Sequence, residues 1–146
     1  MGISAAAILS DCCFFPLDGS AGASEATIRA VISRTYYSTY HTIRPHVESL
    51  PEVKASVRPG LIGHREAYRR LQRWDHPDAD IRKNFRNAAK VASLALLKAI
   101  EVRECADYDL AATITEVDCE LQVSRLAAVT TFASRYAAAI APSIPA

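Results

Sequence analysis

Long segments with a helical pattern of apolar residues, separated by short stretches rich in proline, glycine and aspartate, are the feature that most restricts the fold of this chain. Runs of Val, Ile and Thr that would favour strands are scarce, and Ala and Leu make up much of the 50% hydrophobic content. This composition favours helix over strand. Short connections between amphipathic helices are typical of an up-and-down bundle. We therefore predict an all-α bundle of four to five helices.

Caps and helix breakers place the first half of this bundle. A short first helix is expected over roughly 4–14. Ser24 has the character of an N-cap, and Glu25 suits the positive end of the helix dipole. The helix that begins there should run to about Leu50, with a bend or an interruption at Pro45 because proline lacks an amide N–H.

The same signals place the later elements: a loop over 51–60, a helix over about 64–74, a fourth helix that continues to about residue 106, and a last helix over about 112–140. Either Asp78 or Asp80 can cap the fourth helix. The apolar residues of the last two helices are expected to face the core. In order, these are Val91, Leu94, Leu97, Ile100, Val102, Leu110, Ile114, Val117, Leu121, Val123, Leu126 and Val129.

Length and charge limit the class of protein. The chain has the size of one domain and contains no linker or repeat, so residues 1–146 are predicted to form a single domain. A net charge of +1 means that nucleic acid would have to bind a local basic patch. The four cysteines show no zinc-site spacing; reduced thiols of a cytoplasmic protein are the simplest account, and a structural disulfide is the alternative. No membrane span, metal or cofactor is expected, because no apolar run reaches about 20 residues and no ligand set occurs.

The residues best suited to chemistry lie in the segment 34–41. Positions seven apart on a helix lie two turns apart on nearly the same face. Arg34, Ser38 and His41 should therefore form one polar stripe, with Tyr37 beside it. The opposite face should be buried, because it carries Ile32, Tyr36, Thr39, Ile43 and Val47.

An arginine and a histidine on one face suit the cleavage of a phosphodiester. An imidazole can accept the proton of a 2′-hydroxyl or protonate the leaving oxygen. A guanidinium can bind the phosphate and stabilise the charge that develops in the transition state. RNA supplies its own nucleophile, so neither a metal nor a covalent intermediate is needed. The alternative is an exposed polar helix face on which Arg34 and His41 occur together by chance.

Three elements resemble the HEPN superfamily. Residues 33–37 (Ser-Arg-Thr-Tyr-Tyr) followed by His41 are similar to its motif of an Arg, four to six residues and a His, in the branch that opens with Ser-Arg-x-Tyr-Tyr. Residues 63–66 (Gly-His-Arg-Glu) stand where that branch often has a His-Gly element. Residues 103–108 (Arg-Glu-Cys-Ala-Asp-Tyr) resemble its Arg-x-x-Ala-Asp-Tyr signature. Order and spacing fit, and the resemblance covers about residues 24–140.

The resemblance implies a dimeric helical bundle in which Arg34 and His41 of both subunits meet in a cleft on the two-fold axis. Many members of the superfamily are metal-independent endoribonucleases of toxin–antitoxin or other defence systems. Others are inactive and act as partners of nucleotidyltransferases. Two residues depart from the pattern: Thr35 stands where Asn, Asp or His is frequent, and Ile43 replaces a Tyr that is adenylylated in one toxin branch.

The predicted function is therefore a ribonuclease that uses Arg34 and His41 and acts as a homodimer, with RNA as substrate and an antitoxin or nucleotidyltransferase as a further partner. A catalytically silent domain that binds a nucleotidyltransferase or a nucleotide is the alternative, and a purely structural helical adaptor is a third possibility. Supporting roles are expected for Ser38, Tyr37 and His64, although a histidine at a helix start is often only a solvated or capping group.

A basic patch for RNA is expected on the third helix and at the start of the fourth. It would comprise Arg69, Arg73, Arg82 and Lys83, unless these residues only form a solvated charged face. Arg103 is expected to have a plain electrostatic role near a helix C-terminus. Asp107 and Tyr108 are expected to fix the turn that follows.

Overall fold

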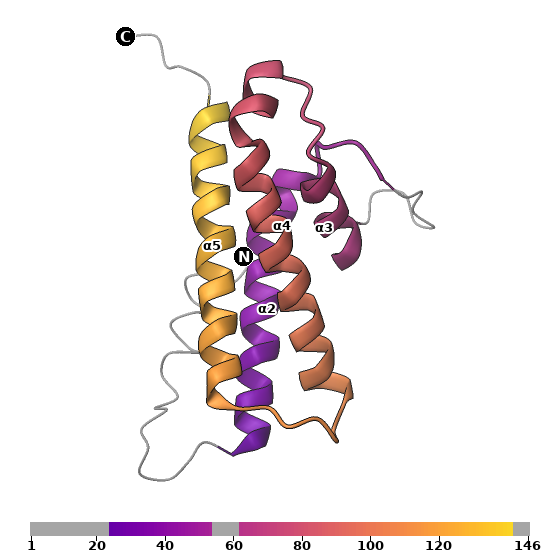
Figure 1. Cartoon of the computed structure of the whole chain (residues 1–146), viewed down its shortest axis with the longest axis vertical. Coiled ribbons are helices and arrows are strands. Elements are labelled where there is room, and N and C mark those ends of the chain that lie inside the picture. Colours follow the sequence, from indigo (N-terminus) through magenta and orange to yellow (C-terminus); the bar gives the residue numbers. More distant parts are fainter. Residues whose placement is uncertain (1–23, 54–61, 142–146) are drawn as a thin grey trace, which may run out of the picture.

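The structure, a computed structural model, describes residues 24–53 and 62–141, and within these ranges every regular element is a helix. The four helices are α2 (Glu25–Val47), α3 (His64–Arg73), α4 (Ala79–Tyr108) and α5 (Glu116–Ile140). They pack as a bundle, which confirms the predicted fold class (Figure 1). The helix expected over 4–14 lies outside the described residues. No helix within the described ranges is both long and apolar enough to cross a membrane.

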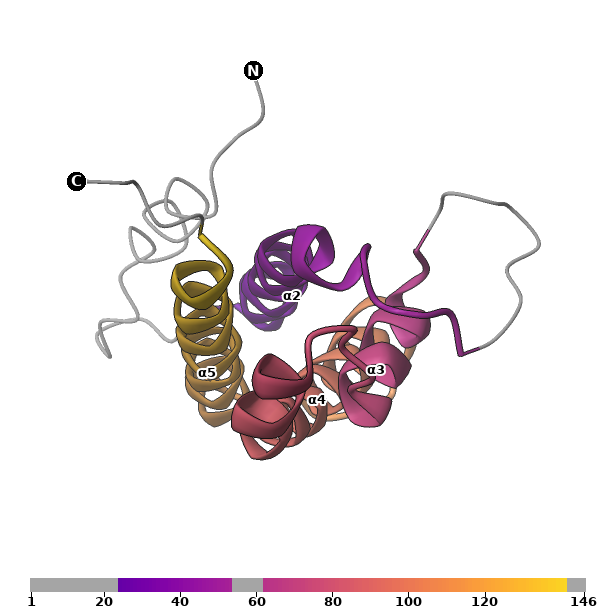
Figure 2. The same cartoon turned by 90° about the horizontal axis from the view of Figure 1, so that it is seen from above.

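The three long helices lie side by side, and α4 runs antiparallel to both α2 and α5 (Figures 1 and 2). The start of α2 contacts the end of α4 through Arg29 and the start of α5 through a 3.6 Å hydrogen bond from Cys119 to the carbonyl oxygen of Ile28. The shorter α3 packs against α4 and α2. In the view from above, α2 and α4 lie on opposite sides of the bundle, with α5 and α3 between them (Figure 2).

Side-chain caps fix two helix starts where the sequence predicted them. Ser24 Oγ accepts a hydrogen bond from the backbone N–H three residues later, at 3.3 Å. Asp78 Oδ1 accepts from the N–H groups two and three residues later, at 2.9 and 3.0 Å. Asp78 rather than Asp80 is therefore the N-cap of α4. Such bonds satisfy amide groups that the first turn of a helix leaves without partners.

Two helix boundaries differ from the prediction. The start of α5 at Glu116 comes four residues later than expected, because Thr115 and Asp118 form a capping box there. Before α5 begins, the Asp109 carboxylate accepts hydrogen bonds from the backbone N–H groups of Ala111 and Ala112, both at 3.2 Å. Helix α2 ends at Val47, about three residues before the expected end, and of the bend or interruption expected at Pro45 the interruption is absent, since Pro45 lies within the helix. Proline this close to a helix end removes little of the hydrogen bonding.

The apolar core is formed mainly by α2, α4 and α5, with α3 closing one side. Its main cluster includes Tyr36, Leu96, Ile100 and Phe132, and a smaller cluster surrounds Ile28 at the start of α2. At the end of α3, the Trp74 ring contacts the rings of Phe85, His76, Phe132 and Tyr136 at centroid distances of 5.6–6.5 Å. These contacts join the end of α3 to α4 and α5.

The apolar residues expected to face the core from α4 and α5 are only partly buried. Ile100, Leu126 and Val129 are in the core, but the exposed set contains Val91, Leu94, Leu110, Val117, Leu121 and Val123. The buried face of α4 instead carries mostly small side chains, namely Ala89, Ala92, Ser93, Leu96 and Ala99. Because alanine occupies both faces of these helices, the larger apolar residues alone do not mark the core face.

Two arginines form hydrogen bonds that connect the end of one helix to a neighbouring helix. Arg29 on α2 donates to four carbonyl oxygens at and just after the end of α4, at 2.6–3.0 Å. Arg70 on α3 donates to two carbonyl oxygens at the end of α2, at 3.0 and 3.2 Å. The last carbonyl groups of a helix lack partners within the helix and attract cations. These arginines therefore fix how α2 sits against α3 and α4.

Candidate functional site

Arg34 and His41 both lie exposed on α2, as the seven-residue spacing predicts. Among residues 24–53 and 62–141, neither side chain forms a hydrogen bond or an ion pair. By contrast, the two nearby arginines of α2 form ion pairs: Arg29 with Glu25 at 2.7 Å and Arg44 with Glu48 at 3.2 Å. As far as the described residues go, the donors of the Arg34 guanidinium are therefore left for an outside anion.

The opposite face of α2 is buried as predicted. Its members, Ile32, Tyr36, Thr39, Ile43 and Val47, are each 0% exposed. Thr39 satisfies its hydroxyl by donating to the carbonyl oxygen of Thr35, four residues earlier, at 2.9 Å. A helix held along one whole face has a fixed rotation about its axis, so the direction in which Arg34 and His41 project is fixed as well.

The residues between Arg34 and His41 divide into two groups. Tyr37 is 38% exposed, as expected for a residue beside the stripe. Ser38 is only 1% exposed, so the structure does not place it on the exposed stripe. At about 100° per residue, Ser38 lies on the side of Arg34 that is turned away from Tyr37. Thr35 is also buried, and its Oγ1 has no hydrogen-bond partner in the described residues.

The structure brings His64, the first residue of α3, against the tyrosines of α2. Its Nδ1 lies 2.5 Å from the Tyr36 hydroxyl, and its ring lies 4.4 Å from the Tyr40 ring and 6.0 Å from the Tyr37 ring between centroids. His64 is therefore packed against α2 and is not simply a solvated group at a helix start. Burial lowers the pKa of His64, and the charges of Arg103 and His41 lower it further, with Glu104 opposing them.

Arg103 on α4 is a candidate residue that the sequence analysis undervalued. It is 5% exposed, and its guanidinium carbon lies 5.0, 5.8 and 5.8 Å from the ring centroids of Tyr36, Tyr37 and Tyr108. Its Nη1 lies 3.7 Å from the Asp107 carboxylate and donates to the Tyr108 hydroxyl at 3.5 Å, while its Nε has no hydrogen-bond partner in the described residues. Contacts of this kind with aromatic rings stabilise a buried cation.

The expected roles of the residues around Arg103 are corrected by these contacts. Arg29, and not Arg103, satisfies the carbonyl groups at the end of α4. Asp109, and not Asp107, holds the following turn. Asp107 instead pairs with Arg103 and accepts a 3.3 Å hydrogen bond from Ser33 on α2.

The sequence contains one signal that would have drawn attention to Arg103. It lies three residues after Ile100 and seven after Leu96, on the buried face of the helix. A charged residue at such a position has to find a partner inside the fold, because burying an unpaired charge is costly.

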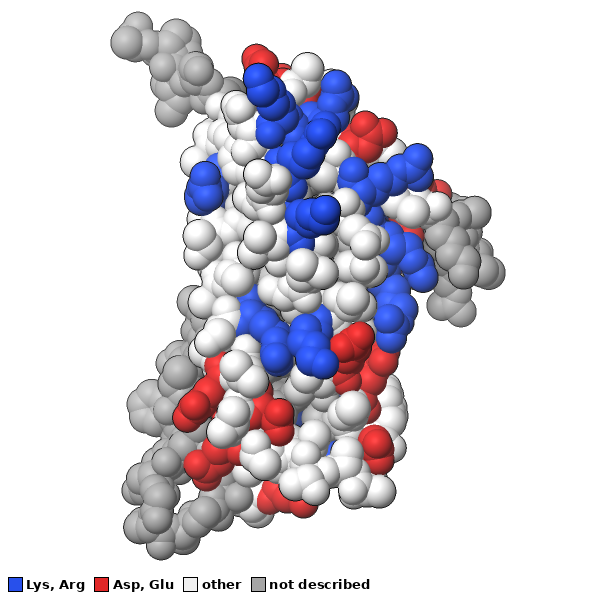
Figure 3. All heavy atoms as spheres, in the orientation of Figure 1, with Lys and Arg blue, Asp and Glu red and all other residues white. Residues whose placement is uncertain are grey.

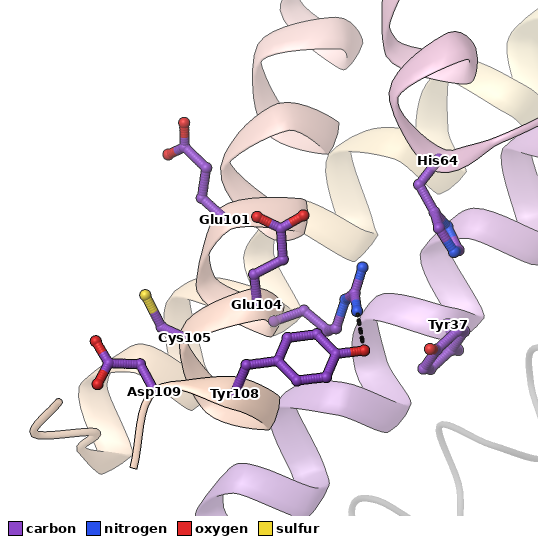
Figure 4. A pocket seen from close by; sticks show the side chains of 8 residues that line it. Tyr37, His64, Glu101, Glu104, Cys105, Tyr108 and Asp109 are labelled. Carbon is purple, nitrogen blue, oxygen red and sulfur yellow. Dashed lines mark hydrogen bonds between the residues drawn. The ribbon is translucent and has the colours of Figure 1, made fainter. Parts of the chain in front are cut away.

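An open cavity of about 860 Å³ lies where α2, α3 and α4 meet. Figure 4 shows Tyr37 from α2, Tyr108 from α4 and His64 from α3 pointing toward the same space, whereas Cys105 and Asp109 lie on the other side of α4. Arg103 also lines the cavity. Tyr37 therefore belongs both to this cavity and to the stretch of α2 between Arg34 and His41.

None of the predicted RNA-binding residues lines this cavity. Arg73 and Lys83 are exposed, whereas Arg69 pairs with Glu66 at 3.9 Å and Arg82 with Asp75 at 4.0 Å. Figure 3 shows Lys and Arg gathered around α3 and the upper part of α4, with Asp and Glu toward its lower end. At 1.5 Å per residue, Arg82 lies about 30 Å along α4 from Arg103. The basic patch and the cavity are therefore separate surfaces.

No group of three or more His, Cys, Asp or Glu side chains in the described ranges is arranged to hold a metal ion. Cys105 and Cys119 are free cysteines. Comparisons with the models of known protein families, with curated proteins and with solved structures each find no match to this chain. The HEPN resemblance therefore stays a prediction from the sequence motifs, and the function has to be argued from the geometry of α2 and its neighbours.

Proposed function

We propose that the protein is a metal-independent endoribonuclease of the cytoplasm in which Arg34 binds the scissile phosphate and His41 moves protons. The observation that supports this most is the state of the two side chains: both are exposed on one face of a helix whose other face is buried, and neither is paired with any described residue. Arg and His side chains that serve the fold are usually paired or packed. These two are available to a ligand.

The proposed reaction needs only groups that RNA and an Arg/His pair supply. One imidazole removes the proton from the 2′-hydroxyl, whose oxygen attacks the adjacent phosphorus. The bond from phosphorus to the 5′-oxygen breaks, and that oxygen receives a proton from a second imidazole or, in a later step, from the same one. The products are a 2′,3′-cyclic phosphate and a 5′-hydroxyl. The guanidinium stabilises the charge on the phosphate oxygens during the transfer.

A homodimer is the second part of the proposal. One chain offers a single exposed imidazole on this face of α2, and a two-fold axis beside Arg34 and His41 would supply the second. Light scattering at micromolar concentration is expected to give twice the mass of one chain. Val91 and Leu94 are exposed apolar residues of α4, the helix that lies opposite α2 in Figure 2. A dimer that Leu94→Glu dissociates and Arg34→Glu leaves intact would contradict the proposed cleft.

The test of the activity compares the wild type with Arg34→Ala and His41→Ala on unstructured and structured RNA. Both variants are expected to lose about 10²–10⁴-fold in cleavage rate, as for the loss of a general acid or base. Cleavage should persist in EDTA and should end in a 2′,3′-cyclic phosphate. DNA and 2′-O-methylated RNA should be inert because they lack the nucleophile. Arg135→Ala is the matched control, since Arg135 is an exposed arginine on α5, outside the predicted basic patch.

Equal cleavage by the wild type and both α2 variants would refute the assignment. In a toxin–antitoxin or defence setting, expression of the wild type should arrest growth and expression of His41→Ala should not. Rescue by the product of a neighbouring gene would identify the antitoxin.

One observation supports the second candidate, a silent domain that partners a nucleotidyltransferase. Thr35, which follows Arg34, is buried with its hydroxyl facing no partner in the described residues, so it cannot assist a reaction at the surface. This candidate predicts no cleavage by the purified protein and a stable complex with a nucleotidyltransferase encoded nearby. Co-purification of the two proteins together with an RNA cleavage assay separates the two candidates.

A further inference from the structure

Three arginines in this fold are largely withdrawn from solvent, and one of them differs from the other two. The side chains of Arg29, Arg70 and Arg103 are 11%, 6% and 7% exposed. Arg29 and Arg70 donate to backbone carbonyl groups at helix ends and also pair with Glu25 and Glu66. These two serve the fold. Arg103 makes only long polar contacts and lines the cavity.

Two tyrosines in the wall of this cavity remain accessible. Tyr37 is 38% exposed and Tyr108 is 73% exposed, although a tyrosine ring normally gains from burial. The two rings flank the Arg103 guanidinium, with its carbon 5.8 Å from each centroid. Figure 4 shows their side chains pointing toward the same space from α2 and α4. Flat aromatic faces beside a guanidinium plane are the surfaces on which proteins stack unpaired bases.

The charges around the cavity select a base over a phosphate. Arg103 is offset by Asp107 at 3.7 Å. The two glutamates of the opening are paired as well, Glu104 with Arg65 at 3.0 Å and Glu101 with Lys98 at 3.2 Å. Among the described residues, a phosphate would therefore meet no unpaired cation at this opening. A base is neutral, and the N–H groups on its edge can donate to carboxylate oxygens.

We propose that this cavity binds one unpaired base of the RNA substrate, stacked against Tyr37 and Tyr108 beside Arg103. The proposal rests on the proposed ribonuclease function, since Tyr37 lies on α2 between Arg34 and His41. The bound base is the one next to the phosphate that Arg34 holds. A base in a duplex cannot enter the cavity without being unpaired, so the enzyme selects single-stranded RNA.

The test measures binding of a fluorescent 2′-O-methyl octamer of adenine nucleotides, which cannot be cleaved, and of an octamer with the same backbone and no bases. Fluorescence anisotropy reports both affinities. The wild type is expected to bind the octamer with bases at least about fivefold more tightly, the lower limit for stacking of one base. Tyr108→Ala should lose at least this factor for the octamer with bases and bind the baseless one as the wild type does.

Two control variants separate stacking from disturbance of the fold. Tyr108→Phe keeps the ring and should bind as the wild type does. Leu110→Ala changes an 80% exposed side chain two residues further on and should have no effect. An octamer bound equally well by the wild type and Tyr108→Ala would overturn the proposal. Equal binding of the two octamers by the wild type would overturn it as well.

Two further measurements distinguish this proposal from a free-nucleotide site and from a ribonuclease without a base site. Adenosine monophosphate should compete only far above the dissociation constant of the octamer, and competition at or below that constant would overturn the RNA assignment in favour of a free nucleotide. Cleavage of RNA by the wild type with unchanged binding by Tyr108→Ala would refute the base site and leave the ribonuclease in place. Base-dependent binding without any cleavage would refute the ribonuclease and retain the base site.

Discussion

Two arginine and histidine pairs of the described residues lie in opposite environments. Arg34 and His41 are exposed on α2, and their side chains form no hydrogen bond or ion pair with a described residue. Arg103, which is buried, and His64, which is half-buried, lie against the tyrosines of α2, and Tyr36 contacts both of them. The two pairs are joined through Tyr37, which lies on the same helix as the first pair and lines the same cavity as the second.

This difference in exposure supports the proposed division of roles between the two pairs. An exposed pair can approach a phosphate from solvent and adjust to it as the reaction proceeds. An enclosed guanidinium surrounded by rings is held in place, and its neighbours already compensate its charge. Such a group can shape a binding surface, but it has little freedom to follow a reacting phosphate. We therefore assign catalysis to the first pair and recognition to the second.

The largest expected effect is on the rate of cleavage, and it separates the two histidines. His41→Ala should lower the rate at saturating RNA by about 10²–10⁴-fold and leave the melting temperature near that of the wild type. His64→Ala should mainly weaken RNA binding, because His64 borders the base site and does not contact the phosphate. Measurement of kcat and KM for both variants checks this assignment. An equal fall of kcat in the two variants would place His64 among the catalytic residues.

The next effect is on stability, and it separates the two arginines. Arg103→Ala removes a buried cation packed against three tyrosines and deprives Asp107 of its ion-pair partner, so it should cost about 2–3 kcal/mol in the free energy of unfolding. Arg34→Ala changes an exposed side chain and should stay within about 0.5 kcal/mol. Urea denaturation of both variants gives these values. A similar loss for the two would mean that Arg34 also serves the fold.

The sequence predicted the exposed pair well because α2 is strongly amphipathic. Arg34 and His41 lie on one face, and the five residues expected opposite them are completely buried. The periodicity of a single helix is a local property, so it can be derived without knowledge of the neighbouring helices. The same reasoning failed for Ser38, whose burial depends on what packs beside α2.

The enclosed pair could not be predicted in the same way because it depends on tertiary contacts. His64 and Arg103 are 39 residues apart, and their contacts with the same tyrosine, Tyr36, require the packing of α3 against α4 and α2. The pattern of larger apolar residues in α4 did not identify the core face of this helix. Its larger apolar residues Val91 and Leu94 are exposed, and alanines occupy the core face on which Arg103 lies.

The smallest effect concerns the pH dependence of stability, and it tests the enclosed pair directly. The pKa of His64 is lowered in the fold, first by burial and then by Arg103 and His41, against Glu104. Between this lowered pKa and the ordinary value near 6.5, the unfolded chain binds more protons than the folded one. The stabilisation is therefore present above pH 6.5 and is lost as the pH falls below it. Burial lowers the pKa of His46 too, so this residue contributes in the same direction.

The measurement is the free energy of unfolding of the wild type, His64→Gln, His46→Gln and the double variant between pH 7.5 and 5.5. Glutamine can still form a hydrogen bond with the Tyr36 hydroxyl, so His64→Gln should fold. Its stability should fall less steeply with decreasing pH than that of the wild type, and the double variant should show the smallest slope. Asp78, whose pKa is lowered below 3.8 by backbone hydrogen bonds, does not titrate in this window. A slope for His64→Gln that is parallel to that of the wild type would show that His64 is not enclosed in solution, and the cavity that it borders would then lack one of its walls.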